Sequence, residues 1–325
     1  MRFSFWVFRY SSVKTFFSLV KFKSLGTSLH GNSALDPCFN ERFSHLASDP
    51  PSLLSFHHSF NSQGDLGALA LAAALQTNSS LTALFLVSTK MGDAGACALA
   101  KVLRTKRQFS TLSLSSNAIG EPGAAAIGKI MRSECCFLSM LILSKNKLGD
   151  SGAAALAEAL CFNSSLTSLD LSFNAIGDAG GMACAKALQS NFGLISLDLS
   201  WNRIGNASAI GFGQALQSNS RLESFNLSWN NSIGDAGGVA IVCALEHNPC
   251  LVSLYLNSER IGHRTAQKAS EVLSLNSSLT TLVIHDDYVP LSLHHVIERR
   301  LQTNSYNKRQ RSLSLFQLLE NILFS

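Results

Sequence analysis

The chain has 325 residues, of which 46% are apolar and 14% charged. It is too apolar for a disordered chain, and Gly, Ser and Asn interrupt its apolar runs too often for a bundle of membrane helices. The net charge of +5 is carried by the ends, because residues 1–35 carry +5 and residues 298–325 carry +3, which leaves −3 for the remainder. A nucleic-acid-binding domain usually carries its basic stripe on the folded body, so we expect no nucleic-acid partner.

Residues 1–52 are predicted to be an N-terminal basic extension that is poorly ordered or serves in targeting. Residues 1–35 are rich in Ser and Phe and contain no acidic residue, a composition that resembles an organellar transit peptide. A surface-anchoring amphipathic helix, a disordered extension and an imprecise gene start are the alternatives. The stretch "SDPPS" at residues 48–52 marks a plausible boundary.

From residue 53 onward the sequence repeats one twelve-position frame, L-x-x-L-x-L-x-x-N-x-I-G, at intervals of 28 or 29 residues. The nine copies begin at Leu53, Leu81, Phe109, Leu138, Leu166, Leu194, Leu222, Leu251 and Leu279. Alternation with period 2 predicts a short strand in each copy, near 81–87, 112–115, 140–144, 168–172, 196–200, 224–228 and 253–257, with Leu169 and Leu197 facing inward. A helix rich in Ala and Gly follows each strand. One strand and one helix cannot bury their apolar faces alone, so the copies must stack around a continuous core.

The ninth frame position is predicted to form a ladder of hydrogen bonds between the turns of successive copies. It is filled by Asn61, Asn117, Asn146, Asn174, Asn202 and Asn230, and is replaced by Thr89, Glu259 and Asp287 near the ends. Asp178, or the loop before it, is expected to cap the start of its own helix. Three of the four N-x-S/T sequons, at Asn78, Asn163 and Asn276, belong to the N-S-S loop of the repeat, which explains them without glycosylation.

This frame resembles the leucine-rich repeat family. The 28-residue period and the phrase N-x-I-G-D-x-G-A-x-A-L-A-x-A-L resemble its ribonuclease-inhibitor-like subclass, which includes the repeat regions of NOD-like receptors and Ran GTPase-activating protein. The resemblance implies an α/β solenoid over residues 53–306, a horseshoe with a concave parallel sheet and convex helices. Residues 307–325 form a basic and apolar tail, expected to cap the last repeat; docking to a membrane or partner is the less favoured alternative.

No catalytic constellation stands out in the sequence. The G-x-x-x-x-G-K-[ST] motif is absent, and neither His57–His58 nor His294–His295 has partner ligands at metal spacing. The eight cysteines form no C-x-x-C pair, which is typical of reduced thiols in an intracellular protein. We therefore expect no enzymatic activity, no cofactor and no metal. We also expect no transmembrane segment, and a cytoplasmic location, with organelle import through the basic N-terminus as the alternative.

The candidate partner-binding residues gather on consecutive copies of the frame. They are Asp170, Asp198, Asn226 and Tyr255 at position five of the frame, and Phe173, Trp201 and Trp229 at position eight of the frame. Neighbouring strands lie about 4.8 Å apart, so the rings are expected to stack beside the acidic residues. A purely structural stack and a binding edge both remain open. Apolar rings beside carboxylates suit a partner with a basic, partly apolar segment.

The sequence therefore predicts a monomeric, non-enzymatic interaction module or scaffold of the NOD-like receptor type, without the nucleotide-binding module. It would bind a protein partner through the concave face and the edge beyond the strands. A GTPase activator similar to Ran GTPase-activating protein is the alternative. Members of that family end in an acidic tail, whereas this chain ends in a basic one.

Overall fold

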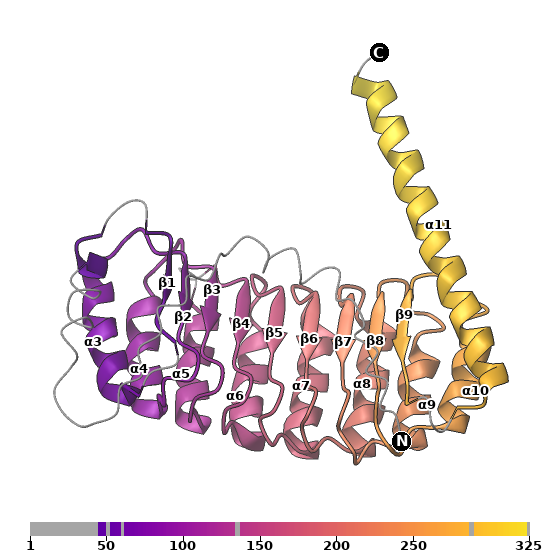
Figure 1. Ribbon diagram of the computed structural model, residues 1–325, viewed down its shortest axis with the longest axis horizontal. Helices are drawn as coiled ribbons and strands as arrows, with labels where there is room; N and C mark the ends of the chain where they lie inside the picture. Colours follow the sequence, from indigo (N-terminus) through magenta and orange to yellow (C-terminus); the bar gives the residue numbers. More distant parts are fainter. Residues whose placement is uncertain (1–44, 50–52, 60–61, 134–136, 286–288, 324–325) are drawn as a thin grey trace, which may run out of the picture. The chain divides into compact units, whose positions relative to one another are not determined.

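The computed structural model describes residues 45–49, 53–59, 62–133, 137–285 and 289–323, the last thirteen of these as backbone only. All of them lie in one compact unit, Pro37–Ser325. Within these residues, nine parallel strands form one sheet in sequence order (Figure 1). The strands are β1 (Ser55–His57), β2 (Ala83–Phe85), β3 (Thr111–Ser113), β4 (Met140–Ile142), β5 (Ser168–Asp170), β6 (Ser196–Asp198), β7 (Ser224–Asn226), β8 (Ser253–Tyr255) and β9 (Thr281–Val283).

One helix connects each strand to the next, and these helices lie together on one side of the sheet (Figure 1). They are α3 (Gly64–Thr77), α4 (Asp93–Leu103), α5 (Glu121–Met131), α6 (Gly149–Leu160), α7 (Asp178–Ser190), α8 (Asn206–Ser218), α9 (Asp235–Ala244) and α10 (His263–Val272). A longer helix, α11 (Leu291–Leu323), follows β9. This architecture confirms the predicted α/β solenoid.

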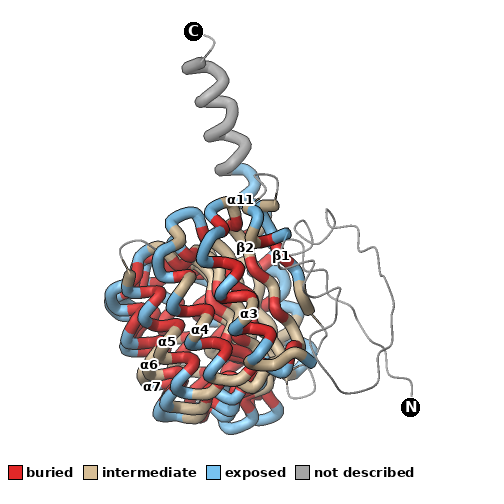
Figure 2. Tube along the Cα trace, turned by 90° about the vertical axis from the view of Figure 1, so that its left-hand side faces the viewer, coloured by how far each residue is buried: buried red, intermediate tan, exposed pale blue. Residues whose placement is uncertain are grey.

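The leucines of the frame set the register of the sheet. Leu169 and Leu197 are paired across β5 and β6, and only 1% and 2% of their surfaces are exposed, so the predicted inward orientation is confirmed. The strands are shorter than predicted, because regular pairing stops at the fifth frame position. Two further bonds follow it between β5 and β6, from the Leu171 N–H to the Asp198 carbonyl and from the Phe173 N–H to the Ser200 carbonyl. Figure 2 shows buried residues recurring along the inner sides of the strands and helices.

Small residues allow neighbouring helices to approach closely, as the Ala- and Gly-rich sequence suggests. A Cβ atom on Gly213 of α8 would lie 2.6 Å from the Ala240 carbonyl oxygen of α9. That distance is too short for any side chain, and the obstacle is backbone, which cannot easily move aside. Glycine at this position therefore sets the spacing of α8 and α9.

The predicted asparagine ladder is present and is centred on fully buried amides. Asn174 donates from Nδ2 to the carbonyls of Leu143, Leu171 and Ser172, over 2.9, 3.0 and 3.0 Å. Its Oδ1 accepts from the Asn146 and Leu148 N–H groups of the preceding repeat. Each amide thus supplies partners to backbone groups in its own turn and in the turn before it.

The ladder differs from the prediction toward the C-terminal end. Glu259 is exposed, and the neighbouring Ser258 is fully buried in its place, donating from Oγ to the Asn230 and Ile233 carbonyls. A short neutral hydroxyl can be buried with its hydrogen bonds satisfied, whereas burial of a Glu carboxylate would cost much more. Near the other end, Thr89 donates to Asn117 Oδ1. Asn61 and Asp287 lie outside the described residues.

A second row of buried asparagines runs along the loops that precede the strands. Asn191 donates from Nδ2 to the Leu160 and Asn163 carbonyls, and its Oδ1 accepts from the Leu194 N–H. The same pattern recurs at Asn163, Asn219, Asn248 and Asn276. The side-chain amides of the N-S-S sequons are therefore buried and hydrogen-bonded within the fold.

The second row begins at Asn78, which donates to the Leu46 carbonyl and accepts from the Leu81 N–H, and its composition changes in the next repeat. Lys106 replaces asparagine in the second repeat and donates from Nζ to the Asn78 carbonyl. At the other end Asn304 of α11 donates to the Asn276 and Leu279 carbonyls, while Ile297 and Leu301 are buried. The first part of α11 therefore covers the last repeat. None of the described helices is both long and apolar enough to cross a membrane.

Aspartates cap the helices, but each caps the helix of the following repeat. Asp178 is the first residue of α7, and its Oδ1 accepts from the Gly205 and Ser208 N–H groups at the start of α8, over 2.9 and 3.1 Å. The expectation that Asp178 caps its own helix is therefore wrong. Asp65, Asp93, Asp150, Asn206 and Asp235 make the same contacts to the next helix. The aspartate carboxylates also lie next to the positive N-terminal ends of the helix dipoles, which is a favourable interaction.

Asn174→Ala should lower the free energy of unfolding by about 3 kcal/mol, because it leaves several buried backbone groups without partners. Asn231 is exposed, and Asn231→Ala should change stability by no more than about 0.5 kcal/mol. Chemical denaturation of both variants measures the difference. Equal losses would mean that the buried amide does not hold the turns together.

The aspartate caps should make the repeats sensitive to acid. Burial raises the pKa of Asp178, but hydrogen bonds from Ser208 and Gly205 outweigh it and leave the pKa lowered overall. A lowered pKa stabilises the fold above the ordinary Asp value of 3.8, and this stabilisation is lost as the pH falls below it.

Asp178→Asn keeps an acceptor, as Asn206 does naturally, but removes the charge. The difference in Tm between the wild type and this variant should therefore shrink as the pH falls from about 5 to about 2. Thermal unfolding across that range tests the charge contribution. A constant difference would assign the cap to hydrogen bonding alone.

Candidate functional site

The face of the sheet that points away from the helices, here called the open face, changes character along the repeats. In β2 and β4 it carries apolar groups, including Phe85, Met140 and Ile142. In β5 to β7 the outward residues are short and polar. Serines fill the third position of the repeat frame, which is the first residue of each strand, at Ser168, Ser196 and Ser224. The polar half contains the predicted site residues.

Asp170, Asp198 and Asn226, the acidic row, lie side by side on β5, β6 and β7 in exact register. Each turns one oxygen toward the serine two residues later. Asp170 Oδ1 accepts from the Ser172 N–H and Oγ–H at 2.9 and 2.7 Å, and Asp198 Oδ1 accepts likewise from Ser200 at 2.8 and 2.6 Å. Asn226 also donates from Nδ2 to Asp198 Oδ2 at 2.9 Å.

The electrostatics of the acidic row are unfavourable for a second negative charge. Burial raises the pKa of Asp198, hydrogen bonds from Ser200 act against it, and the charge of Asp170 raises the pKa further. No described cation lies within ion-pair distance of either carboxylate. The row therefore holds negative charge that the described residues do not neutralise.

Aromatic groups close the row at Tyr255, which pairs in register with Asn226. At the opposite end of the sheet, His57 stacks on Phe85 with ring centroids 4.2 Å apart and planes at 5°. Burial lowers the pKa of His57, which favours its neutral form. The predicted strand residues thus lie on β5 to β8, and a separate aromatic pair lies at the N-terminal end of the sheet.

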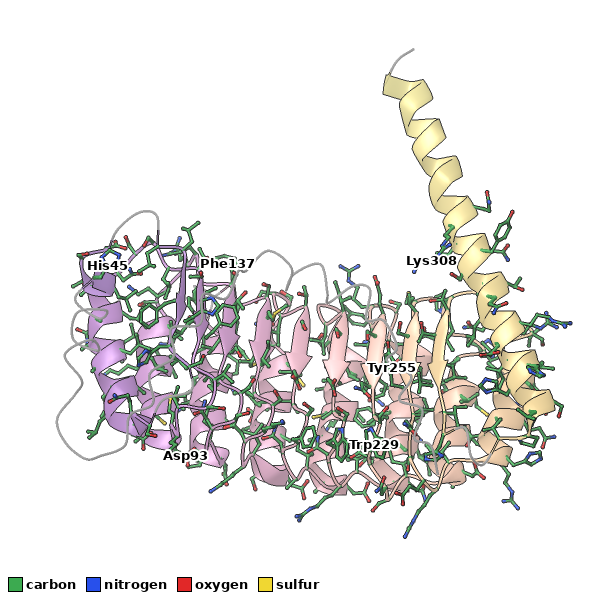
Figure 3. The ribbon with its side chains drawn as sticks, in the orientation of Figure 1. His45, Asp93, Phe137, Trp229, Tyr255 and Lys308 are labelled. Atoms are coloured by element: carbon green, nitrogen blue, oxygen red, sulfur yellow. The ribbon has the colours of Figure 1, made fainter. Side chains whose placement is uncertain are left out.

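Phe173, Trp201 and Trp229, the aromatic column, lie just beyond the carboxyl ends of the strands. Phe173 and Trp201 stack with centroids 4.8 Å apart at 10°, and Trp201 and Trp229 stack at 4.8 Å and 19°. In Figure 3 the label of Trp229 lies below that of Tyr255 of β8, toward the carboxyl ends of the strands. The predicted stacking of the rings is confirmed.

Lys145 also belongs to this column, although it is not among the residues predicted from the sequence. Its ammonium lies 5.2 Å from the centroid of the Phe173 ring, a cation–π contact. Lys145 occupies frame position eight of the preceding repeat, the same position as the three rings. The 28-residue spacing was therefore a usable signal, but a search for aromatic residues alone overlooks it.

The backbone holds the rings in an uncommon conformation. Phe173, Trp201 and Trp229 have φ of 56°, 56° and 61°, in the left-handed region. Their N–H groups donate to the carbonyls of Ser200, Ser228 and Asn257 of the following repeats. The same turn that continues the sheet's hydrogen bonding therefore brings each side chain into the column.

The aromatic column is only partly buried, so its rings are available for contact with another molecule as well as for packing within the fold. Phe173 and Trp201 are 39% and 46% exposed, and Trp229 is half-buried. The facing sides of the rings cover one another, and the remaining surface, including the ring edges, reaches solvent. The stack stabilises neighbouring turns and also leaves an apolar edge for contact with another molecule. Among the described residues, no group of three or more His, Cys, Asp or Glu side chains is placed to hold a metal ion.

The left-handed backbone predicts an unusual order of stability at Trp201. A non-glycine residue in this region costs about 1–2 kcal/mol, so Trp201→Gly should be at least as stable as Trp201→Ala. At Lys186, an exposed residue of α7, glycine should instead be less stable than alanine by about 1 kcal/mol. Denaturation of the four variants tests this, and the same order at both sites would contradict it.

Comparison with known proteins agrees with the repeat architecture. Residues 109–128, 134–157, 162–183, 190–213 and 218–242 match the family model described as Leucine Rich repeat. The chain is similar to a structure titled "Leiomodin-1 Actin-Binding Site 2 (ABS2)", with 20% identity and a TM-score of 0.35, covering 51% of this chain and 80% of that one. It is similar to a tropomodulin C-terminal domain of Caenorhabditis elegans, with 13% identity and a TM-score of 0.40, covering 67% and 97%. No curated protein matches it. The five matched segments are therefore leucine-rich repeats, and the parallel sheet in sequence order is consistent with a leucine-rich repeat solenoid.

Proposed function

We propose that the chain is a non-enzymatic protein–protein interaction module whose partner binds the open face at the acidic row and the aromatic column. One juxtaposition carries this proposal: three stacked rings with exposed edges lie beside two carboxylates that no described cation neutralises. Aromatic side chains are enriched among residues that dominate binding energy, and charged groups provide selectivity and fast association.

The geometry favours a partner that spans several repeats. The acidic row and Tyr255 cover four neighbouring strands, β5 to β8, and the column adds an apolar margin at the strand ends. An extended repeat surface suits a protein segment, since each repeat contributes one side chain at each outward position. We further propose repeats of the ribonuclease-inhibitor-like, NOD-like receptor type in a cytoplasmic monomer. The period and the full helix in each repeat support this subclass.

GTPase activation remains the alternative function. It is separated from simple binding by measuring GTP hydrolysis of a panel of small GTPases with and without the full chain. Faster GTP hydrolysis when the chain is present in a smaller molar amount than the GTPase would favour the alternative. Unchanged hydrolysis rates would favour the interaction module.

The binding face can be tested with a double variant. Proximity labelling with the full chain identifies candidate partners, and pull-down then compares the wild type with Trp201→Ala/Asp198→Ala. We expect binding to fall by at least about tenfold, because the variant removes both apolar contact and charge. Lys186→Ala, on α7 away from the open face, should bind like the wild type.

Circular dichroism and thermal unfolding establish that the double variant is folded. A folded double variant that retains every partner would exclude this face as the principal site. Loss of binding only in unfolded protein would instead assign the column a structural role.

A further inference from the structure

The hydrogen bonds along the acidic row are incomplete at one place. Asn226 donates to Asp198 Oδ2, which links β7 to β6. The corresponding link from β6 to β5 cannot form while Asp198 and Asp170 are both ionised, because both are then acceptors. The serines occupy only Oδ1 of each aspartate. Among the described residues, no donor reaches Oδ2 of Asp170.

The electrostatics at this place also favour a cation. Asp170 and Asp198 face the same side from directly paired positions on adjacent strands, which lie about 4.8 Å apart. Asp198 is partly removed from water and is repelled by Asp170. A positive group between them would relieve the repulsion and supply the missing donors.

We propose that the partner segment carries an arginine whose guanidinium donates to both Asp170 and Asp198, with an apolar side chain nearby that packs on the edges of Phe173 and Trp201. This inference rests on the binding face proposed above and specifies its ligand chemistry. The occupant is an extended basic and apolar peptide segment of another protein.

Arginine fits better than lysine for a geometric reason. The guanidinium is a planar fork with five N–H donors and can serve two acceptors at once, whereas an ammonium acts as a point charge. The acidic row has two carboxylates in adjacent strands and polar serines around them, which matches a fork more closely than a point. Lys145 already supplies a cation to the aromatic column at Phe173, so the acidic row is the part of the face that lacks one.

The spacing of the two features sets the length of the motif. The acidic row is at frame position five and the column is at position eight, three residues later, so the two are separated by at most about 10 Å, the length of three extended residues. A partner segment running in this direction would carry its apolar residue two or three positions from the arginine. Such a motif is short enough to be isolated as a linear peptide.

The test starts from a phage library of random twelve-residue peptides selected on the full chain. The strongest binder is synthesised with a fluorophore, and its affinity is measured by anisotropy together with its Arg→citrulline and Arg→Lys forms. Citrulline has nearly the same shape as arginine but carries no charge. We expect selected peptides to share an arginine two or three residues from an apolar residue. Citrulline should weaken binding by at least about tenfold, and lysine should weaken it measurably.

The matching protein variant is Asp170→Asn/Asp198→Asn. Asparagine is tolerated at this position, because Asn226 accepts from the Ser228 N–H in the same arrangement. On this variant arginine and citrulline peptides should bind nearly equally. Glu121→Gln/Glu158→Gln removes the same charge from exposed helix residues and should preserve the preference for arginine.

The outcomes separate this inference from the proposed function. Peptides that need Trp201 but bind equally with arginine or citrulline would overturn the arginine and leave the binding face intact. Selected peptides that bind Trp201→Ala/Asp198→Ala as well as the wild type, or a selection that yields no binder, would overturn both. A preference for arginine that persists on Asp170→Asn/Asp198→Asn would place the guanidinium elsewhere and overturn the inference.

Discussion

The structure depends on side-chain amides and carboxylates that reach from one repeat into the next. Parallel strands of three residues offer few backbone hydrogen bonds, and the turns between them would otherwise bury unpaired N–H and C=O groups. Asn174 supplies partners in the turns, Asn191 in the loops before the strands, and Asp178 at the helix starts. The leucine core supplies the hydrophobic stabilisation, but these polar contacts fix the register in which it forms. The same polar contacts therefore determine how the side chains of the open face line up from one strand to the next.

Ordered spacing explains why the site is a property of several repeats. Asp170 and Asp198 become neighbours because Leu169 and Leu197 are neighbours on the inner side of the sheet. Likewise, Phe173 and Trp201 stack because their N–H groups bond to successive turns. A single repeat has one carboxylate and one ring, which is a weak surface. When the same type of residue occupies one frame position in successive repeats, its side chains line up across neighbouring strands. Together they form an extended surface.

Much of this could be predicted from the sequence, since a strict period converts a one-dimensional position into a place on the sheet. The inward leucines, the turn asparagines and the stacked rings follow from the frame and strand spacing. Features that depend on the offset between neighbouring repeats were harder. Asp178 was assigned to its own helix because sequence adjacency cannot show that the next helix start lies closer to its carboxylate. Ser258 took the place expected for Glu259 because a local shift in the turn decides which residue faces inward. Lys145 was missed because its chemistry differs from that of the rings.

The aspartate caps give the solenoid a direction. The N-terminus of α8 is completed by Asp178 of the repeat before it, and the start of α7 is completed in the same way by Asp150. Each of these helix starts therefore finds its cap in the part of the chain already synthesised. A nascent chain leaving the ribosome could add repeats one after another onto a finished end, whereas growth from the opposite end would begin with helices whose caps do not yet exist. The two ends of the stack are thus unequal as starting points for folding, although the repeats between them look alike.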